Sequence, residues 1–360
     1  TTTSLQGIAN NLAGRYVLGG DIDASATSGW NGGTGFDPIG NSTGFTGIFD
    51  GLGHTISGLV IDRPGASLVG LFGHAGTGSA VRNLGLLGGS ASGSSYVGGL
   101  VGFGDHGTIT QVYATGAVTG AGNSVGGLVG ENHYGAITQA YTTGAVTGAG
   151  ISVGGLVGYS YYGTVISQAY ATGAVSGTGA VGQNAVVGGL VGQNVLTPIT
   201  QAYATGTVSG GGISVGGLVG FNNGSSITQA YATGAVTGNA SVGGLVGRDE
   251  FGTITEAYAS GAVAGDSGFG GLIGSTYGSY TTINNSYWDS YSTGQTAGVG
   301  NASPAGIIAI TSDPAQSGAA NYAFKQSAYA GFDFTPGTGA WFMVGGSTRA
   351  FLKSAYSTTI

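Results

Sequence analysis

The 360-residue sequence contains no cysteine, one methionine and six prolines, and only 6% of its residues are charged. Without cysteine, a disulfide scaffold and a thiolate-ligated metal site are both excluded. The net charge is −7, and Arg248 is the sole basic residue between Arg82 and Lys325, which disfavours nucleic-acid binding. No run of eighteen apolar residues free of glycine and polar interruption is present, so we expect no membrane-spanning segment.

Glycine is the residue in excess, at 80 of 360 positions, which is about three times ordinary usage. Collagen is excluded because glycine does not recur at every third position and proline is scarce. A disordered tail is excluded because 41% of the residues are hydrophobic and 19 are tyrosine. The composition therefore indicates a folded, glycine-rich protein.

A repeat of about 28 residues governs most of the chain. The pentapeptide GGLVG first begins at Gly98, and its copies and variants centre on Leu71, Leu100, Leu128, Leu156, Leu190, Leu218, Leu245 and Leu272. A second block, I-T-Q-A-Y-A-T-G-A-V-T-G, keeps the same period, and its tyrosines are Tyr113, Tyr141, Tyr170, Tyr203, Tyr231, Tyr258 and Tyr287. One step is longer because extra residues lie around Gly177 to Val187. Two blocks with one period indicate a repeat architecture.

The content of one repeat predicts its structure. Each repeat holds three short β-prone pieces, and glycine this dense would cost a helix about 1 kcal/mol per position. We therefore predict an all-β fold, a parallel β-helix (β-solenoid) with about 28 residues per rung and rungs about 4.8 Å apart. We expect glycine to supply positive φ at corners and close backbone approach between strands.

Equivalent residues of successive rungs should stack in columns, and we expect three of these columns inside. One is the leucine column given above. The valine column comprises Val118, Val146, Val175, Val208, Val236 and Val263, and the isoleucine column comprises Ile109, Ile137, Ile199, Ile227, Ile254 and Ile283. The tyrosine column can face either way, because the alternation of side chains breaks at corners.

The two ends of the chain depart from the repeat. We expect irregular rungs or a cap over residues 1–65, a regular solenoid over 66–290 and a capping or linking segment over 291–360, all within one continuous module. An open solenoid end exposes unpaired strand edges and needs a cover. Trp30, Trp288 and Trp341 are accordingly assigned to cap packing.

These repeats resemble the GLUG repeat, named for its Gly-Leu-any-Gly core. The segment Y-V-L-G-G-D-I-D-A-S, from Tyr16, resembles the stretch that commonly precedes such repeats, and the block Tyr287-Trp288-Asp289 resembles the one that closes them. Such modules occur in filamentous-haemagglutinin-like exoproteins of Gram-negative bacteria, many exported by two-partner secretion, and in some surface proteases. The resemblance implies a right-handed β-helix, secreted or on the bacterial cell surface, with an outer-membrane export partner and a role in adhesion or biofilm matrix. It brings no catalytic residues.

One column varies between otherwise similar repeats, in the stretch that follows GGLVG, which we expect to be a loop. It is rich in aromatic and hydrogen-bonding residues, and it reads F-G-D-H, E-N-H-Y and Y-S-Y-Y in three successive repeats. Aromatic faces beside amide and carboxylate groups suit sugars or peptides. The candidate ligand-binding residues are Phe103, His106, His133, Tyr134, Tyr159, Tyr161, Tyr162, Phe221 and Phe251. The alternative is that exposed corners simply vary freely.

Acidic residues in the same column raise the question of catalysis. Asp105 and Glu131 are expected at corresponding corners of adjacent rungs, and a glycosidase needs two carboxylates roughly 5–10 Å apart. His106 and His133 lie nearby and would complete a divalent metal site. We favour solvated corner residues, and the same interpretation covers Asp249 and Glu250, which lie too far along the chain to pair with them.

Three aspartates near the N-terminus offer oxygen ligands. Asp21 and Asp23 lie on one face of a strand by period two, and with Asp50 they form a weak candidate for Ca²⁺ binding. Turn capping is the favoured explanation. We therefore predict no catalytic residue, no metal site and no cofactor.

The functional prediction is a structural or adhesive module, not an enzyme. A stiff solenoid would display its variable column to host or bacterial surface glycans or matrix, or to neighbouring copies of itself. Two alternatives stay open: a polysaccharide-active enzyme, and an ice-binding or self-assembling filament surface. The filament or ice surface would use regular hydroxyls at Thr115, Thr143, Thr172, Thr205 and Thr233, with Thr119 and Thr147.

Overall fold

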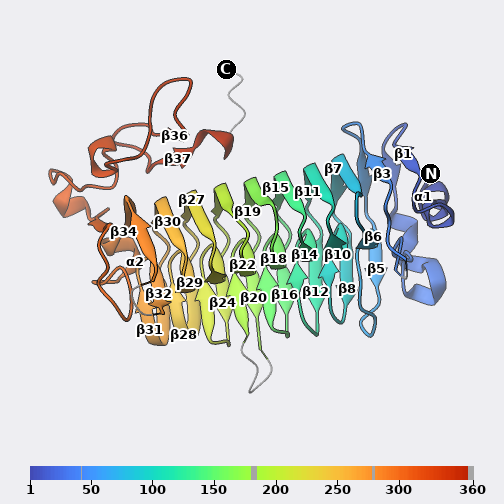
Figure 1. Cartoon of the computed structure of the whole chain (residues 1–360), viewed down its shortest axis with the longest axis horizontal. Coiled ribbons are helices and arrows are strands. Elements are labelled where there is room, and N and C mark those ends of the chain that lie inside the picture. The colour runs from blue at the N-terminus through green and yellow to red at the C-terminus, as the bar shows by residue number, and fades with distance from the viewer. Residues whose placement is uncertain (42, 180–184, 278–279, 356–360) are drawn as a thin grey trace.

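The computed structural model describes residues 1–360 except 42, 180–184, 278–279 and 356–360. It is a parallel β-solenoid with the N-terminus at one end, and its C-terminal segment folds back along one side (Figure 1). Strand pairing confirms the coaxial stacking, since Val118 pairs with Val146 and Val146 with Val175 in register. The all-β prediction is correct, while the right-handed sense of the coil stays a prediction.

Each regular rung contributes strands to three sheets in turn, which we call C, A and B. Sheet C contains β6 (Phe72–Ala75), β10 (Val101–Asp105), β14 (Val129–His133), β18 (Val157–Tyr161), β22 (Val191–Val195), β26 (Val219–Asn223), β29 (Val246–Glu250) and β32 (Ile273–Thr276). Sheet A contains β1 (Arg15–Val17), β2 (Ile22–Asp23), β3 (Ile48–Asp50), β4 (Thr55–Ser57), β7 (Ala80–Leu87), β11 (Thr108–Ala114), β15 (Ala136–Thr142), β19 (Val165–Ala171), β23 (Ile199–Ala204), β27 (Ser226–Ala232), β30 (Thr253–Ala259), β33 (Thr282–Asn284), β34 (Ser286–Asp289) and β35 (Ile307–Ile310).

Sheet B has two arms, because most rungs cross it with two short strands. Its members are β5 (Val60–Asp62), β8 (Ser90–Gly93), β9 (Val97–Gly98), β12 (Ala117–Gly120), β13 (Val125–Gly126), β16 (Val146–Gly148), β17 (Ser152–Gly154), β20 (Val175–Gly177), β21 (Val186–Gly188), β24 (Val208–Gly210), β25 (Ser214–Gly216), β28 (Val236–Gly243) and β31 (Val263–Gly270). The arms join at β28, which runs without a break and pairs with both β24 and β25.

The predicted leucine, valine and isoleucine columns all lie inside. The eight leucines are fully buried, and the least buried members of the other columns, Ile109 and Val263, are 7% and 6% exposed. Stacked apolar columns therefore form one continuous core along the axis, with backbone ladders on every side.

The tyrosine column lies outside, on sheet A, and its rings stack from rung to rung. The Tyr113 and Tyr141 ring centroids are 4.9 Å apart with an angle of 3° between the planes. The outward direction follows from one residue per strand, such as Gln111, whose φ of +56° puts it in the left-handed region. This residue breaks the alternation, so that Val112 points into the core and Tyr113 points out.

The glycines of the pentapeptide serve close approach. A Cβ at Gly154 would lie 2.0 Å from the Val157 carbonyl oxygen, which no side chain can tolerate. At the corner that follows each sheet C strand, the expectation that glycine supplies positive φ holds at Gly224 but is wrong for most rungs. The same left-handed conformation is adopted there by His106, Tyr134, Tyr162, Leu196 and Phe251.

Parallel pairing begins before the regular repeats, because β1 pairs with β3 and β3 with β7. Two short helices, α1 (Thr2–Gln6) and the 3₁₀ helix η1 (Gly7–Asn10), bury Leu5 and Ile8 at this end. Trp30 lies at a kink within the 3₁₀ segment η2 (Ser25–Gly33), and its ring stacks on Phe36 with the ring centroids 6.4 Å apart. Trp30 thus packs against the core.

The C-terminal segment, residues 311–355, is a cover rather than a continuation of the coil (Figure 1). The cover follows α2 (Ser290–Thr293) and β35, and it consists of turns and short elements. These elements are η3 (Pro314–Gln316), η4 (Gln326–Ala328), the antiparallel pair β36 (Trp341–Phe342) and β37 (Phe351–Leu352), and η5 (Lys353–Ala355). Trp341 is fully buried within this cover, whereas Trp288 lies in the solenoid core. No helix in the described part of the chain is long and apolar enough to cross a membrane.

Candidate functional site

The variable column lies mainly on the strands of sheet C, and the prediction of a loop is correct only for the corner that follows each strand. Phe103, Glu131 and Tyr159 are in register with one another, as are Asp105, His133 and Tyr161. His106, Tyr134 and Tyr162 follow directly at the corner. A rigid sheet therefore holds these side chains in fixed rows.

Seven of the nine candidate residues form one continuous group, which we call the sheet C aromatic cluster. Its members are His74, Tyr96, Phe103, His106, His133, Tyr134, Tyr159, Tyr161 and Tyr162. The His106 and Tyr134 rings stack at 4.5 Å, and the Tyr134 and Tyr162 rings stack at 5.9 Å. The cluster extends over several rungs as an aromatic surface.

Phe221 and Phe251 lie outside this cluster. The rung between Tyr159 and Phe221 contributes Gln193, which interrupts the aromatic row. The Arg248 guanidinium lies 5.8 Å from the centre of the Phe221 ring, and Phe251 packs on Tyr277 at 5.9 Å. These two candidates are therefore separate from the other seven.

Two members of the cluster, His74 and Tyr96, were not among the candidate residues predicted from the sequence. His74 pairs in register with Phe103, and their ring centroids are 5.2 Å apart. The weaker repeat around Leu71 carried this signal, since its VGLFGH aligns with the later GGLVGF. Tyr96 precedes the pentapeptide and contacts Phe103 at 6.0 Å, a long-range approach that the repeat pattern does not show.

The corner rings are the most accessible part of the cluster. Tyr134 and Tyr162 are 43% and 45% exposed. Burial, with a smaller contribution from the Glu131 charge, raises the pKa of Tyr159 to about 12. Like an ordinary tyrosine, Tyr159 is protonated at neutral pH, so its phenol can donate a hydrogen bond.

The two carboxylates do not occupy corresponding positions, so that prediction is wrong. Glu131 is opposite Phe103, and Asp105 is opposite His133. Each pairs with a histidine of its own rung: Asp105 Oδ1 lies 2.7 Å from His106 Nδ1, and Glu131 Oε1 lies 2.7 Å from His133 Nε2. Glu131 is also buried, so it is not a solvated corner residue. Among the described residues, no three histidine or acidic side chains group together for a metal ion.

Asp249 also differs from the prediction, because it is fully buried rather than solvated. It ends an internal row of amides in which Asn194 Nδ2 donates to Asn222 Oδ1 at 2.9 Å and Asn222 Nδ2 donates to Asp249 Oδ1 at 2.7 Å. Thr281 Oγ1 donates to Asp249 Oδ2 at 2.6 Å. Burial raises the pKa of Asp249 against these hydrogen bonds. Its neighbour Glu250 instead forms an ion pair with Arg248.

Each of the N-terminal aspartates accepts hydrogen bonds of its own. Asp21 Oδ1 accepts from the Thr55 backbone N–H at 2.8 Å, and Asp23 Oδ1 accepts from the Ser25 N–H at 2.9 Å. These hydrogen bonds lower the pKa of both carboxyls. Asp50 likewise accepts from other groups, so the geometry favours turn capping over a shared Ca²⁺ site.

The cover buries one part of the tyrosine column. Tyr231, Tyr258 and Tyr287 are 5%, 2% and 0% exposed, and they pack against Tyr329, Phe332 and Trp341 among others. The Tyr258 hydroxyl donates to the Ala350 carbonyl at 2.6 Å. Two carboxylates outside the repeat consensus complete the contact, because Arg349 forms an ion pair with buried Asp289, and Trp341 Nε1 donates to Glu256 at 3.3 Å.

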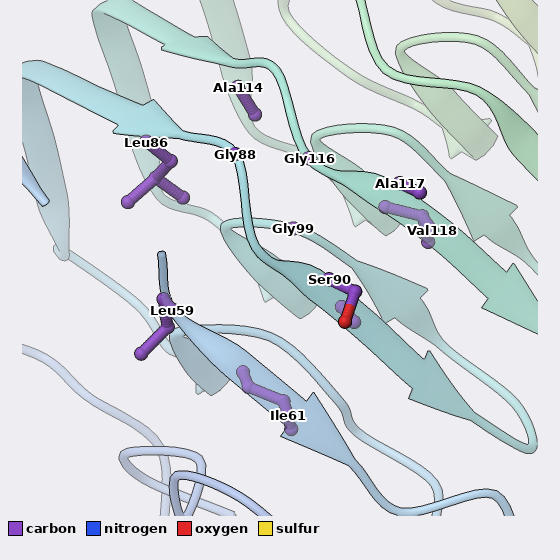
Figure 2. Close-up of a pocket in the computed structure, with 11 residues that line it drawn as sticks. Leu59, Ile61, Leu86, Gly88, Ser90, Gly99, Ala114, Gly116, Ala117 and Val118 are labelled. Atoms are coloured by element: carbon purple, nitrogen blue, oxygen red, sulfur yellow. The ribbon is translucent and has the colours of Figure 1, made fainter. Parts of the chain in front are cut away.

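One interior void lies near the N-terminal end, between β5, β8 and β12. Figure 2 shows the residues that line it, including Leu59, Ile61 and Val118. Its volume is about 20 Å³, and Ala91, one of the residues that line it, occupies a position that is valine in later rungs. It has room for about one water molecule, so it is a packing defect rather than a ligand site.

Comparison with known proteins identifies the repeats. The GLUG motif matches residues 93–119, 149–176 and 211–237, so the resemblance to GLUG repeats is confirmed for these segments. Halomucin of Haloquadratum walsbyi is 49% identical over 121 residues, which make up 31% of this chain and 1% of halomucin. A candidate Gly-rich membrane protein of Evansella cellulosilytica is 40% identical over 91 residues, or 24% of this chain and 10% of that protein.

A solved structure shares the architecture. It is the crystal structure of a candidate immunoglobulin A1 protease from Bacteroides ovatus, with a TM-score of 0.56 and 22% identity over 66% of this chain and 75% of that one. At this identity the similarity shows the fold alone. The chain thus carries GLUG motifs in a parallel β-solenoid, and it spans only a small part of the two sequence relatives.

Proposed function

We propose that this chain is a non-enzymatic adhesive module of a secreted bacterial surface protein, and that the sheet C aromatic cluster binds surface glycans or matrix polysaccharide. The observation that carries the proposal is the cluster itself, which places several accessible or half-buried rings in fixed rows on one rigid sheet. The relatives support a surface role, since one is named halomucin and another a membrane protein. Export as part of a filamentous-haemagglutinin-like exoprotein, with an outer-membrane partner, belongs to the same proposal.

Sugar recognition fits the chemistry of the cluster. Aromatic faces contact the C–H faces of a pyranose, while polar groups at the ring edges bind its hydroxyls. The Tyr134 and Tyr162 rings supply the accessible aromatic surface, and the Asp105–His106 pair lies beside the stacked Tyr134. Because the sheet C strands fix the residues within them and the corner rings directly follow those strands, binding needs little ordering of the protein backbone.

Glycan-array binding tests the proposal. We expect the wild-type chain to bind one or more glycan classes, and the double variant Tyr134→Ala/Tyr162→Ala to lose at least about tenfold in affinity, roughly 1.4 kcal/mol. Phe251→Ala is the matched control, because Phe251 occupies the same kind of left-handed corner and is 50% exposed but lies outside the cluster. Equal loss in the control, or none in the double variant, would remove the cluster as the binding site. Release of sugars from the bound polysaccharide would contradict the non-enzymatic role.

A second candidate function, ice binding or filament assembly, has one specific observation in its favour. Hydroxyls form an in-register row on the outer face of sheet B at Thr119, Thr147, Ser176, Ser209 and Thr237. A thermal-hysteresis measurement tests ice binding, and sedimentation at increasing concentration tests assembly. Replacing Thr119 and Thr147 by lysine should abolish either effect.

A further inference from the structure

Strand β1, at the N-terminal end of sheet A, has one free edge. It pairs with β3 on one side and with no strand on the other within the described residues. The Leu18 N–H donates to the Asp50 carbonyl at 3.0 Å, so Leu18 faces β3. Alternate residues of a paired strand bond to the same neighbour, so the backbone groups of Arg15 and Val17 point away from β3. No hydrogen-bond partner on that side is recorded for them in the part of the chain that the structure describes.

Other strand edges at the two ends of the solenoid are closed or blunted. At the end of β32, the Asn301 side-chain amide forms two hydrogen bonds with the Thr276 backbone, both at 2.9 Å. The Gln6 amide forms the same pair of bonds with the Asp37 backbone, at 2.9 and 3.0 Å. The edge strand β31 carries exposed Asp266, and a charge of this kind hinders pairing with another strand. The open edge of β1 is therefore a departure from the way these ends are finished.

A groove follows the free edge of β1. It lies between β1 and the helices α1 and η1 at the N-terminal end (Figure 1), and its volume is about 390 Å³. Leu5, Ile8, Leu18 and Phe49 are buried members of its lining, while Val17, on the strand itself, is 65% exposed. A strand laid along this edge would cover Val17 and gain apolar contact as well as backbone hydrogen bonds.

Arg15 gives this edge a charge that selects its partner. Each of the other four arginines forms an ion pair, namely Arg63 with Asp37, Arg82 with Asp50, Arg248 with Glu250 and Arg349 with Asp289. Arg15 is exposed, and no ion pair of its guanidinium is recorded among the described residues. Neighbouring strands are stabilised by opposite charges side by side and destabilised by like charges. The edge therefore disfavours a basic strand and favours an acidic one.

From this edge, groove and charge we propose that β1 is the docking site for an extended acidic polypeptide segment, which adds to sheet A as a further strand. The backbone groups of Arg15 and Val17 bond to the segment, a carboxylate of the segment pairs with the Arg15 guanidinium, and an apolar side chain covers Val17. In strand addition of this kind, main-chain hydrogen bonds give affinity and side chains give specificity. The site lies apart from the sheet C aromatic cluster and does not rest on the function proposed for it.

Two short peptides that differ by one residue test the proposal. They are acetyl-SDVVTS-amide and acetyl-SKVVTS-amide, each used at about 2 mM because a single short strand is expected to bind with Kd on the order of 1 mM. Saturation-transfer NMR on the valine methyl groups of the peptide reports binding to the wild-type chain and to every variant. The acidic peptide should receive saturation from the wild-type protein, and the lysine peptide should receive little.

A charge exchange tests the role of Arg15. Arg15→Glu should weaken binding of the acidic peptide about fivefold and should bind the lysine peptide instead. Arg248→Glu is the matched control, because it makes the same change in net charge on sheet C and should leave the binding of both peptides unchanged. Gain of the lysine peptide by Arg15→Glu separates the loss of a partner charge from damage to the fold.

A proline substitution tests the free edge itself. Val17→Pro removes the N–H that points away from β3, which an edge strand tolerates, and should weaken binding of the acidic peptide about fivefold. Val17→Thr keeps this N–H and should retain most of the binding. The Tyr134→Ala/Tyr162→Ala variant should bind the peptide normally, so failure of the sheet C proposal is seen separately.

Three results would overturn the proposal. One is the absence of saturation transfer to the acidic peptide, and another is an equal effect of Arg15→Glu and Arg248→Glu. The third comes from sedimentation of the wild-type chain at increasing concentration. Self-association that Val17→Pro abolishes would mean that a second copy, rather than an acidic segment, occupies the edge of β1.

Discussion

The tyrosine column has two halves that are alike in sequence and different in environment. Tyr113 and Tyr141 remain partly exposed on sheet A, while Tyr231, Tyr258 and Tyr287 are buried by the cover. Ring stacking is nearly the same in both, with centroids 4.9 Å apart for Tyr113–Tyr141 and 5.3 Å for Tyr231–Tyr258. The repeat therefore builds the same local structure throughout, and something outside the repeat decides which part is covered.

Two carboxylates distinguish the covered half. Glu256 stands where earlier rungs have glutamine, and it accepts from the Trp341 indole. Asp289 lies at the end of β34 and pairs with Arg349. A repetitive surface offers many equivalent docking positions, so single departures from the repeat are what fix the cover in one register. The position of the cover on the solenoid is therefore set by residues that depart from the repeat.

The largest expected effect comes from breaking the ion pair between the cover and the solenoid. Asp289 is fully buried, so Arg349→Ala leaves an uncompensated carboxylate and should cost about 3–5 kcal/mol in the opening of the cover. Hydrogen exchange should show the amides of β36 and β37 losing protection while those of β15 keep theirs. Arg248→Ala is the control, because its partner Glu250 lies on the solenoid itself and the pair is partly exposed; its cost should be about 0–1 kcal/mol. Equal protection in Arg349→Ala and wild type would show that the ion pair does not hold the cover.

Acid should open the same contact to a smaller degree. Burial acts to raise the pKa of Asp289, but hydrogen bonds from Arg349 and Ser312 and the Arg349 charge hold it below its ordinary value of 3.8. A lowered folded-state pKa contributes stability that is complete above the unfolded value and is lost as pH falls through the folded value. We expect exchange in β36 and β37 to accelerate below about pH 4, before β15 is affected. In Arg349→Ala this acid-dependent step should largely disappear, and its persistence would assign the step to another group.

Hydroxyl removal compares the halves directly. Tyr258→Phe deletes the hydrogen bond to the Ala350 carbonyl and should cost about 1 kcal/mol. Tyr141→Phe removes the equivalent hydroxyl in the open half and should change the midpoint of thermal unfolding little, because that side chain is only half buried. Equal costs for the two variants would mean that the cover adds nothing to the energetics of the column.

The smallest expected effect concerns Asp249, a buried residue that departs from the repeat. Asp249 replaces the asparagine of the two preceding rungs, and Asp249→Asn should stabilise the protein at pH 7 by at most about 1 kcal/mol, because a buried charge is removed while the new amide NH2 faces the Gly252 N–H that donates to Oδ2 in the wild type. A raised folded-state pKa gives stability that is complete below the unfolded value and is lost as pH rises through the folded value. The gain from Asp249→Asn should therefore shrink at acid pH in thermal unfolding. Asn222→Asp is the reverse control and should destabilise at neutral pH.

The regular part of the fold was predictable because each apolar column repeats with one period. Leu100, Val146 and Ile137 were expected inside, and each is buried. Seven candidate site residues also come together as one cluster, because stacking brings residues 28 apart into contact. The pattern failed at Asp249, which was interpreted as a surface residue because the sequence does not show that this strand position points inward.

The sequence by itself determined the period, the parallel stacking and the composition of the core, because only coaxial layers bury every repeated apolar position at once. The tertiary structure alone decided that the tyrosines face outward, since one left-handed residue in each strand, such as Gln111, shifts the alternation of the residues that follow. It also decided where the cover docks. Those features depend on contacts such as Arg349–Asp289 and Tyr258–Ala350 between segments far apart in the chain, which no repeat period encodes.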